Sequence, residues 1–353
     1  MSGPAPVAYA APDTAPSAKP RRANPLVRWT MILITVLFLG SFIALPTVNI
    51  FRQALGLEWS DFKSPTAVKI GVEKYISVFH VTPPDPNVKL DRKARRAADR
   101  RQAQVEDTHN AIVMTLCVLA VTLPLNVLFG IAAAWAVTKF HFKGKTLLVS
   151  LIDLPFSVSP VVAGMIFVLL LGRGGLLGEW PQHLHWPWPL SAYWQGFDGH
   201  WFPIGFSDWR EGVIFTPLAT ALASIFVTFP FVARSLIPLM ETQGVESEQA
   251  AMTLGASGPK MFFRVTLPQI KWGLLYGVIL CTARAVGEFG AVSVVSGHLD
   301  ANDTMPLRIE KLWQGYDNQG AFAVASLLAS ISIVTLLMKI FIDRKVAQDR
   351  EDA

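Results

Sequence analysis

Six long apolar segments constrain this chain more than any other feature of its sequence. They cover roughly 29–50, 111–138, 146–171, 213–238, 270–295 and 320–342. About 20 apolar residues in a helix cross a bilayer, and a helix satisfies its own backbone hydrogen bonds in lipid. Composition agrees, because 52% of the 353 residues are hydrophobic and only 16% are charged. We therefore predict an all-α integral membrane protein with six transmembrane helices, and exclude a soluble, disordered, collagen-like or disulfide-scaffold chain.

The two ends of the chain are polar. Residues 1–28 are rich in Ala, Pro and Ser and carry four basic residues, which predicts a disordered basic tail. The first apolar run is longer than a signal-peptide core and has no clear cleavage site, so it is expected to stay as the first span of a permease domain over 29–342. Residues 343–353 are predicted to be a second tail. Six spans place both tails on the same side.

The basic residues test which side that is. Segments assigned to the cytoplasm carry 15 Lys and Arg, including Arg234, and segments assigned to the outside also carry 15. Eleven of the outer ones lie in 51–110, at a length where the positive-inside rule stops applying, and without that loop 4 remain. We therefore expect the N- and C-termini in the cytoplasm.

Two outer segments stand apart. Residues 85–107 alternate charges with alanines, which predicts a solvated helix. Residues 179–209 hold six tryptophans, which favours an aromatic belt at the membrane interface, with a partner-docking surface as the alternative.

The most informative segment is the loop Gly244–Gly273, which reads GVESEQAAMTLGASGPKMFFRVTLPQIKWG. Glu246 and Glu248 begin a short helix of small residues, where acidic side chains complement the helix N-terminus. Gly255 allows a sharp turn, and a second helix starts at 257–259. Pro268 is expected to interrupt the chain before the next span. The pattern predicts a helix–turn–helix on the cytoplasmic face, and the alternative is a loop that merely turns.

This spacing resembles the coupling loop of ABC importer permeases, Glu-Ala-Ala, three residues, Gly, nine residues, then Ile-x-Leu-Pro. The aligned residues are Gln249, Ala250, Ala251, Gly255, Val265, Leu267 and Pro268. Gln249 stands where the family has Glu, and Val265 where it has Ile, while Glu248 lies one residue early. The resemblance implies the type I importer permease fold with a cytoplasmic coupling helix, and leaves open whether Glu248 replaces the missing carboxylate.

Two further segments, Leu151–Met165 and Ala283–Gly297, resemble the W-type permease subunit of bacterial sulfate/thiosulfate importers. The resemblance covers most of 111–342, while the N-tail, 85–107 and 179–209 look like expansions of one lineage. It implies a multi-pass protein of the bacterial inner membrane that forms a path with a sister permease of the T or U type. Further implied partners are two ATPase subunits, which bind ATP and Mg, and a periplasmic sulfate/thiosulfate-binding protein, with lipid around the spans.

Arg284 and Glu288 are charges inside a predicted span, where charges are costly and are functional candidates by default. Their i,i+4 spacing lets them pair. We favour a structural pair, because a path that held sulfate tightly would not release it, and the alternative places Arg284 on the anion route. Asp153, just before Pro155, is expected to cap or pair locally.

Four hydroxyls offer neutral donors to a tetrahedral oxyanion, namely Ser157, Ser159, Ser293 and Ser296. Neutral donors suit transient passage, and ordinary interhelical packing of small residues is the alternative.

Other chemistry finds little support. Gly144-Lys145-Thr146 resembles the end of a phosphate-binding loop, but position 139 is Lys where that loop needs Gly. His183 and His185 have no further ligand set, so no metal is expected, and no nucleophile–base arrangement suggests an enzyme.

Cys117 and Cys281 fall in apolar runs and are expected to be packing residues. The net charge of +5 fits basic residues flanking spans rather than nucleic-acid binding.

The sequence thus predicts a permease subunit of an ATP-driven importer, with no cofactor of its own. Sulfate or thiosulfate is the favoured cargo, and molybdate or tungstate is the nearest alternative because both are also tetrahedral dianions. A different class, an ATP-independent anion channel or secondary transporter, would leave the loop around Gly255 unexplained.

Overall fold

The computed structural model describes residues 25–80, 91–172, 174–177, 214–297 and 303–351. It divides into two units, Met1–Asn49 and Ile50–Ala353. The described part of the first unit belongs to α1 (Pro25–Ala54), whose large apolar side chains are exposed along its length. The predicted tail over 1–28 and the Trp-rich segment 179–209 lie largely or wholly outside the described residues.

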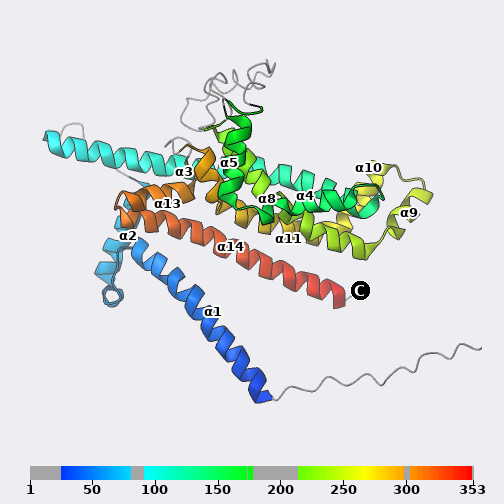
Figure 1. The fold of residues 1–353 in the computed structure, drawn as a ribbon. Helices are drawn as coiled ribbons and strands as arrows, with labels where there is room; N and C mark the ends of the chain where they lie inside the picture. The colour runs from blue at the N-terminus through cyan, green and yellow to red at the C-terminus, as the bar shows by residue number, and fades with distance from the viewer. Residues whose placement is uncertain (1–24, 81–90, 173, 178–213, 298–302, 352–353) are drawn as a thin grey trace, which may run out of the picture. The chain divides into compact units, whose positions relative to one another are not determined.

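The second unit is built from helices and turns throughout its described residues, which confirms the all-α prediction (Figure 1). The short turn η1 (Asp61–Lys63) comes first. Its helices are α2 (Pro65–Phe79), α3 (Arg92–Lys139), α4 (Lys145–Ser157), α5 (Pro160–Leu171), α8 (Pro217–Gln243), α9 (Glu246–Thr253), α10 (Gly258–Met261), the π-helical segment η3 (Phe262–Thr266), α11 (Leu267–Val286), α12 (Gly290–Val295), α13 (Met305–Gln314) and α14 (Asn318–Glu351).

Five stretches are long and apolar enough to cross a membrane: α1, α3, α8, the continuous Gly258–Val286 and α14. A sixth is present if α4 and α5 count together, but these two are bent by 110° at Val158–Ser159. The structure therefore breaks the run 146–171, which the sequence predicts as one span. Pro160 explains the position of the break, because a proline disfavours helical geometry in the residue before it.

α3 and α14 extend well beyond their predicted spans. α3 has 48 residues, or about 72 Å at 1.5 Å per residue, against a hydrocarbon core of about 30 Å. Its charged first turns, from Arg92, are thus one helix with the second span rather than a separate element. In the same way α14 continues through 343–351, where the sequence predicts a tail.

Arg308 fixes α13 to the charged part of α3. The arginine is buried, and its Nη2 donates to the Gln104 carbonyl at 2.8 Å. Its Nη1 lies 3.3 Å from Asp107 Oδ2, and its Nε donates to Thr108 Oγ1 at 3.3 Å. A buried guanidinium needs several such partners. These contacts tie α13 to the part of α3 that lies before its predicted span.

α8 is the centre of the unit, because it packs against α3, α4, α5, α11 and α12. A Cβ on Gly130 of α3 would lie 2.6 Å from Val232 of α8, so these helices touch through the glycine. Asn126 of α3 donates to Thr228 Oγ1 at 2.6 Å and to the free Cys281 Sγ of α11 at 3.4 Å. Small residues and interhelical hydrogen bonds hold helices together in lipid, where apolar burial gives little preference.

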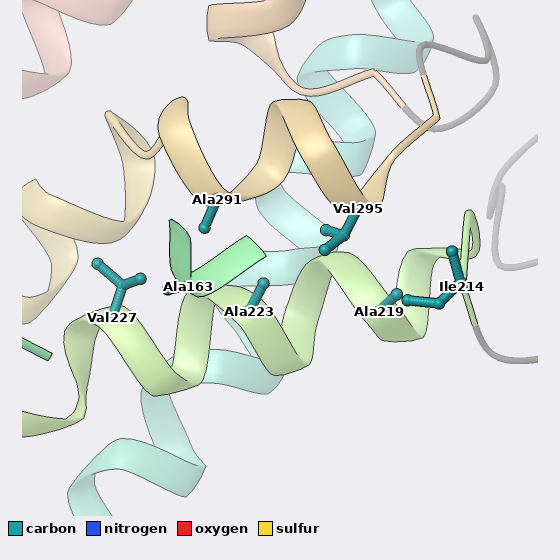
Figure 2. Close-up of a cluster of buried hydrophobic side chains, with 7 residues drawn as sticks. All are labelled: Ala163, Ile214, Ala219, Ala223, Val227, Ala291 and Val295. Atoms are coloured by element: carbon teal, nitrogen blue, oxygen red, sulfur yellow. The ribbon is translucent and has the colours of Figure 1, made fainter. Parts of the chain in front are cut away.

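Small residues also bring α5, α8 and α12 together (Figure 2). Ala163 of α5 and Ala291 of α12 meet the α8 face that carries Ala219 and Ala223. All four are almost fully buried. The cluster holds the second half of the bent pair against the short helix α12.

Gly277→Val is expected to destabilise this packing strongly. A Cβ there would collide with the Ser235 side chain and lie 3.2 Å from the Val232 Cα, so the α8–α11 contact must open. Overpacking of this kind costs about 1–3 kcal/mol or more. The melting temperature of Gly277→Val in detergent should fall by several degrees. Gly40 has open space around it, so the melting temperature of Gly40→Val should change little. Equal melting temperatures for the two variants would contradict the close packing.

Candidate functional site

The loop between the fourth and fifth spans forms the predicted helix–turn–helix. α9 begins at Glu246, and the chain turns at Gly255, whose φ is +85°. Such a φ is disfavoured for residues with a side chain. α10 then begins at Gly258, with Pro259 in its first turn.

Pro268 does not interrupt the chain, contrary to expectation, because Gly258–Val286 is one continuous helical stretch. The π-helical segment Phe262–Thr266 lies just before Pro268. In it, the Leu267 N–H donates to the Phe262 carbonyl, five residues back. Proline lacks an N–H and clashes with an ordinary preceding turn. The wider turn accommodates it within the helix.

Glu248 points into the protein rather than toward solvent. Its Oε2 lies 3.1 Å from Lys139 Nζ, and both side chains are only 8% exposed. Its Oε1 accepts from Thr266 Oγ1 at 2.7 Å. Lys139 Nζ also donates to the Gly244 carbonyl. One carboxylate thus joins α9 to the last turn of α3, where a cation complements the helix dipole, and to η3.

Two further contacts hold the same loop. Trp135 of α3 stacks on Phe262 with ring centroids 4.9 Å apart. Gln243 Nε2 donates to the Gln269 carbonyl at 3.0 Å, which closes the base of the loop. The loop is therefore attached to its own spans at several points.

Several other residues of the loop are exposed. They include Gln249 and Ala250 and three large apolar side chains, Met252, Leu254 and Phe263. Leu254, beside the Gly255 turn, is 88% exposed. Large apolar side chains exposed in this way are candidates for an interaction site. Gln249, at the position of the family's Glu, is thus exposed, while Glu248 forms its contacts inside the protein.

The bent pair α4–α5 meets a second break. α11 ends at Val286 and α12 begins at Gly290, so the predicted span 270–295 is also divided. A Cβ on Gly290 would lie 2.9 Å from Pro160 Cβ, and one on Gly164 would lie 2.7 Å from the Ala291 carbonyl. The two interruptions therefore lie side by side.

The predicted pair of Arg284 and Glu288 is present at this place. Arg284 Nη1 lies 2.9 Å from Glu288 Oε2, and the glutamate side chain is 1% exposed against 34% for the arginine. Glu288 Oε1 accepts from the Ala291 N–H at 3.0 Å. Glu288 thus sits in the break, where it pairs with Arg284 and caps α12.

The four serines divide into two pairs. Ser157 and Ser159 are exposed and flank the α4–α5 break. Ser293 Oγ donates to the Gly290 carbonyl at 2.9 Å, and Ser296 is fully buried. Ser293, on α12, is thus hydrogen-bonded within its helix, and Ser296, just after α12, is enclosed.

The sequence did not predict one further ion pair, which joins α4 and α8. Arg234, counted with the cytoplasmic segments in the charge comparison, lies inside α8, and its Nε donates to Asp153 Oδ1 at 2.7 Å. Asp153 therefore pairs across helices, not locally. The only sequence signal for this pairing is that Arg234 stands within an apolar run.

The phosphate-loop resemblance has no support in the fold. Gly144 precedes α4 with φ +101°, and α3, rather than a strand, comes before the turn. Among the described residues no group of three or more His, Cys, Asp or Glu could hold a metal ion. His183 and His185 lie outside those residues.

These features define the membrane component of a transporter, and comparison with known proteins agrees. Residues 107–348 match the family of binding-protein-dependent transport system inner membrane components, and the chain belongs to this family. The fold is shared with a bacterial alginate ABC transporter solved in complex with an alginate pentasaccharide-bound periplasmic protein, at 16% identity and a TM-score of 0.58, over 91% of this chain and 95% of that one.

Within the family the chain is CysW-like. It is 46% identical over 234 residues to the sulfate transport system permease protein CysW of Escherichia coli (strain K12), covering 66% of this chain and 72% of that protein. It is 38% identical to the CysW protein of Synechococcus elongatus over 93% of each chain. The CysT protein of E. coli (strain K12) is 33% identical, over 64% of this chain and 73% of that protein.

Proposed function

We propose that this chain is the transmembrane permease subunit of an ATP-driven importer for sulfate, and that it forms the translocation path with a sister permease. The observation that carries the proposal is the 38–46% identity to sulfate permeases of the CysW type. Thiosulfate is a second cargo of the same charge. The match to CysT supports a related but distinct sister subunit.

The loop of α9 and α10 is the proposed contact with the ATPase. Glu248, Gln249, Ala250, Ala251, Gly255, Leu267 and Pro268 are the coupling residues. The exposed side of the loop, with Met252 and Leu254, would enter a cleft of one ATPase subunit, while Glu248 keeps the loop attached to α3. ATP and Mg belong to the two ATPase subunits, so hydrolysis occurs outside this chain.

The direction of transport follows from this assignment. The loop must face the cytoplasm to meet the ATPase, which puts the N- and C-termini there as well. A periplasmic binding protein would then deliver the anion to the other side, where the charged turns of α3 and the helix α13 lie. ATP binding favours one of two states of the complex, because the partners contact those states differently.

A complementation assay tests the cargo. A bacterial strain without sulfate import, supplied with this chain and its partner subunits, is expected to grow on sulfate as its sole sulfur source. Excess thiosulfate should compete for uptake of radiolabelled sulfate, and molybdate should compete much less. Failure to grow, or uptake blocked by equimolar molybdate, would contradict a sulfate importer and favour the molybdate alternative.

A further inference from the structure

A second ion pair in the spans lies on an open surface. The side chains of Arg234 on α8 and Asp153 on α4 are 55% and 35% exposed. Asp153 is eight residues beyond Lys145, or about 12 Å along α4, and Arg234 is nine residues before Gln243, or about 14 Å along α8. Both residues fall within the predicted spans, 146–171 and 213–238.

Contact between this ion pair and the lipid hydrocarbon would be energetically costly. Charged side chains within spans are costly and almost always face the bundle interior or a water-filled cavity. The side of α4 and α8 that carries Arg234 and Asp153 therefore borders the path or the sister subunit.

The arginine uses its Nε for the ion pair, and its side chain is more than half exposed. Its Nε is bound to Asp153, and its Cζ lies 5.0 Å from the centroid of the Phe156 ring. Within the described residues no other group pairs with the guanidinium of Arg234. The Nη1 and Nη2 groups are therefore available to a ligand. Their planar pair of N–H donors fits two oxygens of an oxyanion.

We infer that Arg234 is a transient binding site for the transported oxyanion, with Asp153 and Phe156 as positioning residues. The inference rests on the proposed function, which makes the cargo a tetrahedral dianion. The negative charge of Asp153 offsets part of the attraction between Arg234 and the dianion, so the site holds the anion weakly enough to release it. Arg284 is less suited, because its Nη1 is engaged by a buried carboxylate.

The direct test is chemical protection in the assembled importer. The complex in lipid nanodiscs, without nucleotide, is treated with phenylglyoxal, and modified arginines are quantified by peptide mass spectrometry. Sulfate should slow modification of Arg234 at least about 5-fold relative to chloride at equal ionic strength, because it occupies the charge-assisted hydrogen bonds of the fork. The exposed Arg96 should react equally in both salts. Equal modification of Arg234 in both salts, or none in either because the sister subunit covers it, would overturn the site.

Variants separate binding from a structural pair. Arg234→Gln should lower sulfate uptake about 10-fold, the effect of one lost charge-assisted contact, while the loaded binding protein still stimulates ATP hydrolysis. Asp153→Asn should instead lower the sulfate concentration that half-protects Arg234, because its attraction is no longer offset. If both variants lower uptake alike, and the sulfate concentration that half-protects Arg234 is the same in Asp153→Asn as in the wild type, the pair is structural only. A wild-type complex that imports no sulfate would refute the proposed function instead.

Discussion

Glu248→Ala is expected to abolish ATP-driven sulfate uptake while the protein remains in the membrane. The substitution leaves the buried Lys139 ammonium without its carboxylate and removes the acceptor of Thr266. Removing one partner of a buried ion pair costs about 3–5 kcal/mol. That cost falls mainly on the attachment of α9, so the population with the loop in place should fall at least about 100-fold.

Glu246→Ala is the matched control, because this glutamate lies on the same short helix and is exposed. It should import sulfate within about 2-fold of wild type. Hydrogen exchange over α9 and η3 should rise in Glu248→Ala and not in the control. The double replacement of Lys139 and Glu248 by Met should restore slow exchange, since apolar substitution of a whole buried pair is often neutral. Wild-type uptake by Glu248→Ala would refute the anchor.

Gly255→Val should uncouple ATP hydrolysis from uptake. The turn holds Gly255 at φ +85°, which a β-branched residue adopts poorly. The left-handed conformation costs a residue with a side chain about 1–2 kcal/mol, enough to reduce the correct turn by about 5- to 30-fold. Uptake should fall by that order, and the loaded binding protein should no longer stimulate the ATPase.

Gly258→Val isolates the cause. Neither glycine has an atom within 4 Å of an added Cβ, but only Gly255 has a positive φ. Gly258→Val should therefore retain most of the uptake, and both variants should reach the membrane at wild-type levels. If the two variants behave alike, added bulk rather than turn geometry decides the effect.

The sequence predicts those features whose signals are local. Apolar runs of sufficient length indicate spans without any knowledge of packing, and the α9 turn follows from Gly255 and its neighbours. The Arg284–Glu288 pair follows from i,i+4 spacing. Each of these depends on residues close together along the chain.

The features missed depend on contacts between distant segments. Hydropathy does not register the break at Val158–Ser159, which is stabilised by the fit of Gly164 against α12. The partners of Glu248 and Arg234 lie on other helices, so the sequence left the role of Glu248 open and did not predict the Arg234–Asp153 pair. Pro268 continues a helix because a π-helical segment precedes it, which no local rule indicates.

We propose that partner subunits supply the energy of ATP hydrolysis for anion import through this chain. The most direct measurement is uptake of radiolabelled sulfate into proteoliposomes that contain the full complex, with the binding protein on the outside and ATP within. The account predicts uptake that requires hydrolysable ATP and stops when this chain is omitted. Uptake at the same rate without ATP, or driven by an ion gradient alone, would contradict it.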